Sequence, residues 1–555
     1  MNFKNHFTMN ESENLKNIIY GIDYCGKKLI ELQSEEKPYY GVLRPFNYAD
    51  FLSNKTLNYD YENENQVYDY IMNLFNGMPN WKSPKTLLNI IPPASDVSVV
   101  SSMMVDRANA NISHDEYAGY IATAELEVIK YISDLVGWNW KNSTGIFTFG
   151  GKGTIVYALR SALVRAEPDG KINGYNKDYF FITSVKAHPC YAEVASWLGI
   201  GSNACKKVKC DDEGKLNIDE AYNIIKENIK SGKTFLGFIA VGGTTVELEI
   251  DNIKSICELR KAIVDDFDLS YTPWIHTDSV VGWVWSMFNS YDFDNNPLSI
   301  PKNVISDIKD INNDIKQLTY ADSFGVDFHK TGFCPYISSL FMVKNREDFF
   351  KLGDNTPTMR LESTNYGEYA PFEQTLELTR SAKGPIGALS SLKLFGIKGY
   401  QEMLIQLHTT TSRFRDTFSK KKYIRILNSA SRGIATLFFV TPTKYENMSL
   451  DDILLLNEKD IEYIKNYNMQ LADFICKANE TDNSLLISAT DAFPINGTRI
   501  YIGMMKAYSL SLVANNNDII DIIDTFEKNK IKFDNSNITI ENISNKPSDM
   551  VYRKG

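Results

Sequence analysis

The sequence is poor in cysteine and histidine for its length. Its 555 residues include seven cysteines and six histidines. A small, odd number of cysteines argues against a disulfide framework and favours free thiols in a reducing compartment. Cys205 and Cys210 would make half of a zinc site, but no second pair accompanies them. We therefore predict no metal centre.

Long hydrophobic runs and an excess of positive charge are also missing. No segment reaches the ~20 uncharged apolar residues of a membrane-spanning helix, and Met1 to Leu15 lacks the apolar core of a signal peptide. The formal net charge is -10, whereas nucleic acids and anionic membranes attract clustered positive charge. We expect a soluble, cytoplasmic protein that acts on a small molecule and binds neither nucleic acid nor membrane.

The apolar residues, 43% of the chain, can fill more than one lobe. From Thr144 to Val343, short apolar runs alternate with amphipathic helices, a pattern typical of an α/β fold with a mainly parallel sheet. The expected strands are 144–148, 179–183, 234–241, 272–276 and 338–343.

The flanking segments predict further parts. Residues 84–111 read as irregular, and Leu126, Ile129, Ile132 and Val136 as one helix face leading into the sheet. Residues 424–440 and 498–503 are β-like, which indicates a smaller C-terminal α+β lobe. We expect three regions: an N-terminal segment 1–85, a large domain 86–395 and a small domain 396–555.

A glycine-rich turn joins the predicted strand 144–148 to a helix. Gly150-Gly151-Lys152-Gly153-Thr154 offers unhindered backbone amides at a helix N-terminus, where a phosphate dianion can bind. A tight turn that requires glycine explains the segment equally well. A nucleotide-binding P-loop does not fit, because Gly153 follows Lys152 where Ser or Thr is required.

Three of the six histidines, His188, His276 and His329, are expected at strand ends, where open α/β sheets bind ligands. His188 could stack on an aromatic cofactor, although a lone histidine is more often structural. Asp278 would be costly to bury without a cation or hydrogen-bond donors. A protonated ring nitrogen would satisfy it, as would a helix cap or an internal ion pair; a metal site with His276 lacks a third ligand.

Lys330 lies in an apolar setting. Phe324 to Phe328 is mostly apolar, and Thr331 to Leu340 carries no charge. A lone lysine is usually a solvated surface charge, but these flanks argue against an exposed helix face. We expect a partly buried amine with the lowered pKa that Schiff-base chemistry uses.

The order of these motifs resembles that of the group II pyridoxal-phosphate-dependent amino acid decarboxylases, which include glutamate, aromatic amino acid and bacterial tyrosine decarboxylases. The similarity covers roughly Pro84 to Tyr400 and rests on the glycine turn, His188, Gly243-Thr244-Thr245, His276-Thr-Asp278 and Asp327-Phe-His-Lys330. It implies fold type I, the aspartate-aminotransferase-like α/β fold with a mainly parallel seven-stranded sheet. It also implies a homodimer with pyridoxal 5′-phosphate as cofactor in the large domain.

The resemblance assigns roles residue by residue. Lys330 would carry the cofactor, Asp278 would pair with its pyridine nitrogen, and His188 would stack on its ring. Thr245 would lie near Asp278 or the cofactor's phenolic oxygen. The phosphate would be held by Gly151, Lys152, Thr154 and His329, with Ser323 as a further candidate.

The reaction implied is decarboxylation of an L-amino acid to its amine and carbon dioxide, through an external aldimine and a quinonoid. Tyr336, in a stretch most like the bacterial tyrosine decarboxylases, or His188 would protonate the α-carbon. Tyr366 and Tyr369 of a predicted lid, 351–369, compete for that role. The substrate stays open among aromatic, acidic and diamino acids.

Two departures from the family pattern leave alternatives. Lys152 stands where Ser or Thr is usual, and Val280-Val281 replaces small residues after the His-x-Asp motif. The alternatives are a pyridoxal-phosphate enzyme with another reaction, namely decarboxylative oxidative deamination, carbon–carbon lysis or amino transfer, and a relative that is not a catalyst.

Overall fold

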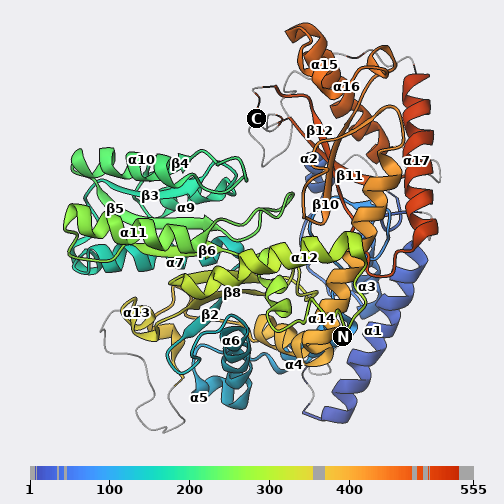
Figure 1. Ribbon diagram of the computed structural model, residues 1–555. Helices are drawn as coiled ribbons and strands as arrows, with labels where there is room; N and C mark the ends of the chain where they lie inside the picture. Colours follow the sequence, from blue (N-terminus) through green and yellow to red (C-terminus); the bar gives the residue numbers. More distant parts are fainter. Residues whose placement is uncertain are drawn as a thin grey trace. The chain divides into compact units, whose positions relative to one another are not determined.

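A computed structural model (Figure 1) describes residues 7, 9–33, 37–42, 47–353, 369–477, 484–491, 495, 498, 500–536 and 540. The chain divides into two compact units. The larger unit contains Ile90–Ser412 and Ala430–Ile434, and the smaller unit contains Met1–Asn89, Arg413–Ser429 and Ala435–Gly555. Within the described ranges, no helix combines the length and apolar character needed to cross a bilayer.

The larger unit is built on a seven-stranded sheet with the order β2-β8-β7-β6-β5-β3-β4. Strand β8 is antiparallel to both of its neighbours, and the other four pairs are parallel. The predicted α/β fold with a mainly parallel seven-stranded sheet is therefore confirmed. The strands are β2 (Thr144–Thr148), β3 (Tyr179–Ser184), β4 (Cys205–Val208), β5 (Thr234–Val241), β6 (Trp274–Asp278), β7 (Ser323–Asp327) and β8 (Ser339–Val343).

Helices cover both faces of this sheet (Figure 1). The helices of the larger unit are α4 (Asp96–Ala108), α5 (Asp115–Ala118), α6 (Thr123–Leu135), α7 (Gly151–Ala166), α8 (Gly170–Asn173), α9 (Cys190–Trp197), α10 (Ile218–Lys230), α11 (Ile253–Phe267), α12 (Lys302–Ile315) and α13 (Arg346–Phe350). Helix α14 (Lys383–Phe418) begins in this unit and ends in the smaller one.

Strand β3 illustrates why the strands read as continuous apolar runs. Phe181 packs into a cluster with residues of α7, whereas Phe180 and Ile182 pack with residues of α10 and α11. Side chains alternate between the two faces of a strand, so a parallel strand covered by helices on both sides has no polar face.

The prediction that residues 84–111 are irregular was wrong, because α4 lies within them. Ser95 caps this helix by accepting a hydrogen bond from the Ser98 N–H, and Asn109 ends it in the left-handed region at φ 50°. Several of its hydrophobic residues, including Val97 and Val100, are exposed. The helix therefore lacks the single apolar stripe that would have revealed it.

Two strands of the seven-stranded sheet were not predicted, and one lies later than expected. Strand β4 was missed because Lys206 and Lys207 interrupt its apolar pattern, and β7 was missed because Gly325 and the terminal Asp327 interrupt its pattern. Strand β6 begins at Trp274, which places His276 inside the strand, so the expectation that it lies at a strand end was wrong.

The smaller unit has a five-stranded sheet with the order β1-β11-β12-β10-β9, in which only the β1–β11 pair is parallel. The β-structure predicted at 498–503 was misplaced, since the strand is β12. The strands are β1 (Thr86–Leu87), β9 (Ile424–Ile426), β10 (Ala435–Val440), β11 (Leu486–Thr490) and β12 (Met504–Tyr508), and the helices are α1 (Glu11–Leu32), α2 (Tyr48–Ser53), α3 (Glu64–Asn73), α15 (Leu450–Leu454), α16 (Glu458–Lys477) and α17 (Asn516–Asp534).

Candidate active site

The predicted site residues follow strands that end at one edge of the larger unit's sheet. Strands β3, β5, β6 and β7 are parallel, and β2 runs in the same direction because both β2 and β7 are antiparallel to β8. The N-terminus of α7 therefore lies at the same edge as the carboxyl ends of the parallel strands. In open α/β sheets this edge is where ligands bind.

Lys330 lies just beyond β7, with its side chain 23% exposed. Its Nζ is 2.9 Å from Oδ2 of Asp327, the last residue of that strand. Asp327 is almost fully buried, and its Oδ1 accepts a hydrogen bond of 2.5 Å from the Ser339 hydroxyl on β8. A buried carboxylate thus holds the lysine amine.

This ion pair reverses the expected direction of the lysine pKa. Burial alone lowers the pKa of Lys330, but the adjacent Asp327, with help from Asp278, outweighs burial and raises it. The prediction of a lowered pKa was therefore wrong for the protein without cofactor.

Asp278, at the end of β6, has one satisfied and one unsatisfied carboxylate oxygen. Tyr191 of α9 donates a 2.5 Å hydrogen bond to Oδ2. Oδ1 is buried and has no hydrogen-bond partner among the described residues. Burial raises the pKa of Asp278, while Tyr191 and Lys330 lower it. A buried acceptor without a donor is costly, so a donor from a bound molecule would stabilise this carboxylate.

His188 lies between β3 and α9, at the same edge of the sheet. Its Nδ1 accepts a 3.3 Å hydrogen bond from the Cys190 N–H, which leaves the ring proton on Nε2. Partial desolvation is the main cause that lowers the pKa of His188; Asp278 opposes it, and Lys330 reinforces it. The imidazole is therefore held mainly neutral near pH 7.

The glycine turn forms the N-terminus of α7. Gly150 has φ +120°, a conformation that L side chains rarely adopt. The hydroxyl of Thr154 donates to the Gly151 carbonyl at 2.7 Å and is buried, so Thr154 supports the helix rather than facing a ligand. The Lys152 ammonium lies 2.5 Å from Glu193 of α9, and both side chains are about half exposed. Because the Thr154 hydroxyl and the Lys152 ammonium already have partners, an anion would bind to the backbone amides of the first turn of α7.

His329 and Tyr336 lie together beside Lys330. Their ring centroids are 4.1 Å apart. His329 Nδ1 accepts from the Ser338 N–H at 3.2 Å, and its Nε2 is 3.5 Å from Asp327 Oδ2. Tyr336 is 50% exposed.

Other predicted residues are not brought into this group. Ser323 begins β7, at the opposite end of the strand from Asp327, and its hydroxyl is bonded to His276 and to the Trp274 indole. Thr245 is half-buried after β5 and makes no hydrogen bond to Asp278. Of the predicted lid, 354–368 lies outside the described residues.

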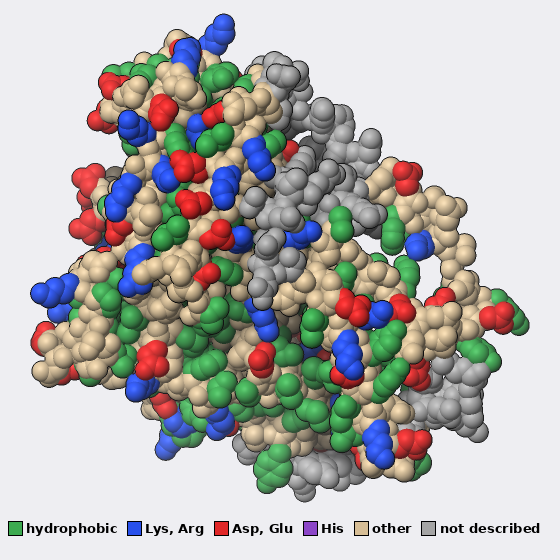
Figure 2. Space-filling model, turned by 90° about the vertical axis from the view of Figure 1, so that its right-hand side faces the viewer, with side chains coloured by type: hydrophobic (Ala, Val, Ile, Leu, Met, Phe, Trp, Pro, Cys, Tyr) green, Lys and Arg blue, Asp and Glu red, His purple; other side chains and the backbone are tan. Residues whose placement is uncertain are grey.

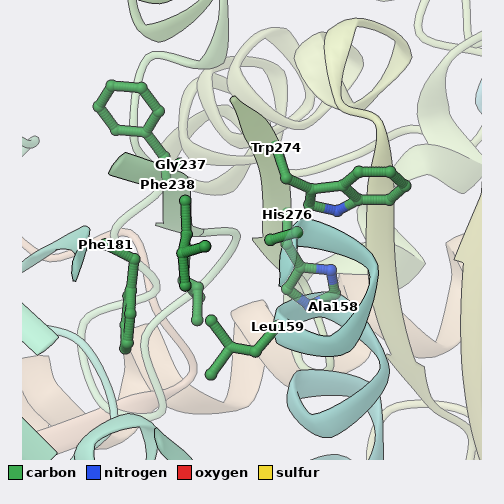
Figure 3. A pocket seen from close by; sticks show the side chains of 10 residues that line it. Ala158, Leu159, Phe181, Gly237, Phe238, Trp274 and His276 are labelled. Carbon is green, nitrogen blue, oxygen red and sulfur yellow. The ribbon is translucent and has the colours of Figure 1, made fainter. Parts of the chain in front are cut away.

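A small internal cavity lies between α7 and the sheet (Figure 3). Ala158 and Leu159 of the helix and Trp274 and His276 of β6 contribute to its wall. Its volume of about 10 Å³ has room for no more than about one water molecule. Burial lowers the pKa of His276 to about 3, so this imidazole is neutral. The cavity is part of the core and is no substrate pocket.

Residues 48–294 match the sequence profile described as "Pyridoxal-dependent decarboxylase conserved domain". The chain is 21% identical over 360 residues to L-2,4-diaminobutyrate decarboxylase of Rhizobium meliloti (strain 1021), covering 64% of each protein. It is 28% identical over 199 residues to an acidic amino acid decarboxylase of Xenopus tropicalis, covering 35% of this chain and 36% of that protein. The chain thus aligns with less than two thirds of either relative.

The crystal structure of mouse CSAD in apo form is similar in fold, with a TM-score of 0.74 at 15% identity over 92% of this chain and 99% of that one. The fold is therefore fold type I, as predicted. Residues 48–294, less than half of the chain, thus resemble the conserved domain of the pyridoxal-dependent decarboxylases, and the cofactor that this resemblance implies is pyridoxal phosphate.

The residues at the sheet edge fit this cofactor. The unsatisfied Oδ1 of Asp278 can accept the N–H of a protonated pyridine ring, and the first turn of α7 can bind a phosphate. Lys330 supplies an amine beside both. His188 and Asp278 lie inside the matched segment 48–294, whereas Lys330 lies beyond it.

Two residues with clear contacts to the site were given no role from the sequence. Tyr191 lies three positions after His188, and Asp327 lies three positions before Lys330. The spacing of Asp327 from Lys330 could have indicated an ion pair. No signal linked Tyr191 to Asp278, 87 residues later.

Proposed function

We propose that this protein is a pyridoxal-phosphate-dependent enzyme that decarboxylates an L-amino acid to its amine and carbon dioxide. The observation that carries the proposal is that one sheet edge holds both the Lys330 amine and the buried carboxylate of Asp278, which has one unsatisfied oxygen. The domain profile supports it independently, since it covers the segment that contains His188 and Asp278.

Each part of the cofactor has a candidate partner in the chain. Lys330 would bind its aldehyde carbon covalently, and Asp278 Oδ1 would accept the pyridine N–H. The backbone amides of Gly151 and Lys152 would hold its phosphate at the N-terminus of α7. His188 would contact the ring face, and His329 would hold Tyr336 in place through their ring contact.

Bound pyridoxal phosphate supplies an electron sink for the pair of electrons left when the substrate's carboxylate departs. Asp278 would keep the pyridine nitrogen protonated, because a buried carboxylate with one free oxygen favours a positive neighbour. Tyr336 and His188 are the candidates to deliver a proton to the substrate's α-carbon. The half-exposed side chain of Tyr336 and the Nε2 proton of His188 suit that step.

We propose an L-amino acid as the substrate class and leave its side chain open. The Rhizobium relative is named for L-2,4-diaminobutyrate and the Xenopus relative for acidic amino acids, while the stretch around Tyr336 favours an aromatic substrate. All three classes therefore belong in the test.

A homodimer in the cytoplasm, as the sequence predicts, is part of the proposal. Figure 2 presents a face on which hydrophobic side chains gather among scattered charges. On α4, Val97, Val100 and Met104 are exposed at helical spacing, and exposed apolar groups of this kind often mark contact surfaces. Light scattering should give twice the mass of the chain.

The test of the activity is product identification. Purified protein with pyridoxal phosphate is incubated separately with L-2,4-diaminobutyrate, L-glutamate, L-aspartate, L-tyrosine and L-tryptophan, and products are identified by mass spectrometry. We expect an amine lighter by one carbon dioxide from at least one of them, and none from Lys330→Ala protein. An aldehyde, a keto acid or no product from the wild type would contradict decarboxylation.

A further inference from the structure

Asp327 is the buried group in direct contact with Lys330, and the function proposed above gives it no chemical step. Its side chain is 1% exposed, and its two oxygens have different partners. Oδ2 faces the Lys330 ammonium at 2.9 Å, and Oδ1 accepts the Ser339 hydroxyl. The carboxylate is therefore fixed from β8 while it binds the amine.

The same carboxylate lies against the N-terminus of α7. A Cβ added at Gly151 would come 3.1 Å from Asp327 Oδ2. The partial positive charge of a helix N-terminus stabilises an anion there. Four groups therefore surround the Asp327 side chain: the α7 terminus, the Ser339 hydroxyl, the Lys330 ammonium and the His329 ring.

We propose that Asp327 is a positioning residue that keeps the Lys330 amine protonated before the cofactor binds and so sets the pH at which Lys330 can react with an aldehyde. The inference rests on the proposed function, because it concerns the residue that would carry pyridoxal phosphate. It adds a control on cofactor attachment that the decarboxylation itself does not require.

The chemistry explains why protonation matters. The ammonium must first release a proton to solvent, because only the neutral amine has a free electron pair. That pair forms the bond to the aldehyde carbon, the carbonyl oxygen leaves as water, and a carbon–nitrogen double bond remains. A neighbouring carboxylate within 4 Å opposes the first step by stabilising the charged form.

Other charged or titratable groups also face Lys330. Asp278 from β6 and Tyr336 from the loop after Lys330 act in the same direction as Asp327 but more weakly. Lys330 in turn influences the pKa of His188, which lies between β3 and α9, and of Cys190, which begins α9. Both Lys330 and Asp327 influence the pKa of His329. Asp327 differs from all of them in its direct contact with the amine.

The test is the pH dependence of Lys330 acetylation in full-length protein freed of cofactor. The protein is treated with a trace of acetic anhydride between pH 6 and 12, and the Lys330 peptide is quantified by mass spectrometry against an added free amine. In Asp327→Asn, which can still accept the Ser339 hydrogen bond, we expect the midpoint to fall by about one to three pH units. Below the midpoint, reactivity should rise at least about tenfold.

Two matched variants separate charge from packing. Asp327→Glu keeps the charge and should hold the midpoint near that of the wild type. Ser339→Ala removes a hydrogen bond from Asp327 but leaves its charge, so it too should shift the midpoint far less than Asp327→Asn. An unchanged midpoint in Asp327→Asn, or equal shifts in all three variants, would overturn the inference.

Wild-type protein gives a result even if Asp327→Asn fails to fold. Its Lys330 midpoint should lie above the ~10.4 of an unperturbed lysine, and a midpoint below that value would contradict the role of Asp327. The acetylation readout needs no cofactor. Failure of the proposed function would leave Lys330 without attached pyridoxal phosphate, whereas failure of this inference alone would leave attachment intact and the midpoint unshifted.

Discussion

The Tyr191–Asp278 hydrogen bond is the contact whose removal has the most specific expected effect. Tyr191→Phe keeps the ring, so it creates no large cavity, but it removes the only donor that the described residues offer to Asp278 Oδ2. Both oxygens of a buried carboxylate would then lack a partner in the cofactor-free protein. Hydrogen bonds to charged groups contribute about 1.5–3 kcal/mol, and we expect a loss of that size in the free energy of unfolding at pH 8.

The penalty should depend on pH in a defined direction. Burial raises the folded-state pKa of Asp278, and Tyr191 works against that rise, so Tyr191→Phe should raise the pKa further. A folded-state pKa above the unfolded value means that the folded protein loses stability as the pH rises through that interval. The difference between variant and wild type should therefore be largest at pH 8 and should shrink as the pH falls through that interval, because protonation removes the buried charge.

Urea denaturation followed by tryptophan fluorescence measures this effect. Trp274, Trp283 and Trp285 are buried in the larger unit and report its unfolding. Tyr222→Phe is the matched control, since the Tyr222 hydroxyl donates to Asp266 at 2.8 Å on the exposed surface, and it should leave the urea midpoint unchanged. An equal, pH-independent effect of the two variants would refute the reasoning.

Two further predictions concern the site and the core. Asp278→Ala should still bind pyridoxal phosphate, seen as a retained visible absorbance, but lose most of its turnover because the pyridine nitrogen lacks its partner; near-normal turnover would count against this role. Arg380→Met should cost about 3–5 kcal/mol in urea denaturation, because it leaves the fully buried Glu125 without the cation with which it pairs; a cost below about 1 kcal/mol would show that the pair is dispensable.

The sheet was largely predictable because its strands are short apolar runs separated by helices. Residues 144–148 and 234–241 form strands with the predicted bounds. Strands that contain charged or small residues were not predicted. Strand β4 is an example, because Lys206 and Lys207 interrupt its apolar pattern. The helical periodicity also overestimated the burial of Leu126. This residue is 44% exposed, although Ile129 and Ile132 of the same helix are buried.

The site was predictable in position but not in its contacts. Predicted strand ends placed His188 and Asp278 at one edge of the sheet, whereas Lys330, singled out by its apolar flanks, follows the unpredicted strand β7 to the same edge. Contacts between residues far apart in sequence could not be predicted from strand ends or local motifs. Lys152 is paired with Glu193, 41 residues later, and no periodicity or local motif encodes such a pair.

Whether Lys330 carries the cofactor can be answered by one measurement. The protein is saturated with pyridoxal phosphate, reduced with borohydride and digested, and the modified lysine is located by mass spectrometry. We expect the reduced cofactor on Lys330 and none on the nearby Lys152, with the modification lost in Lys330→Ala. Reduced cofactor on another lysine, or undiminished attachment in Lys330→Ala, would contradict the assignment of this site.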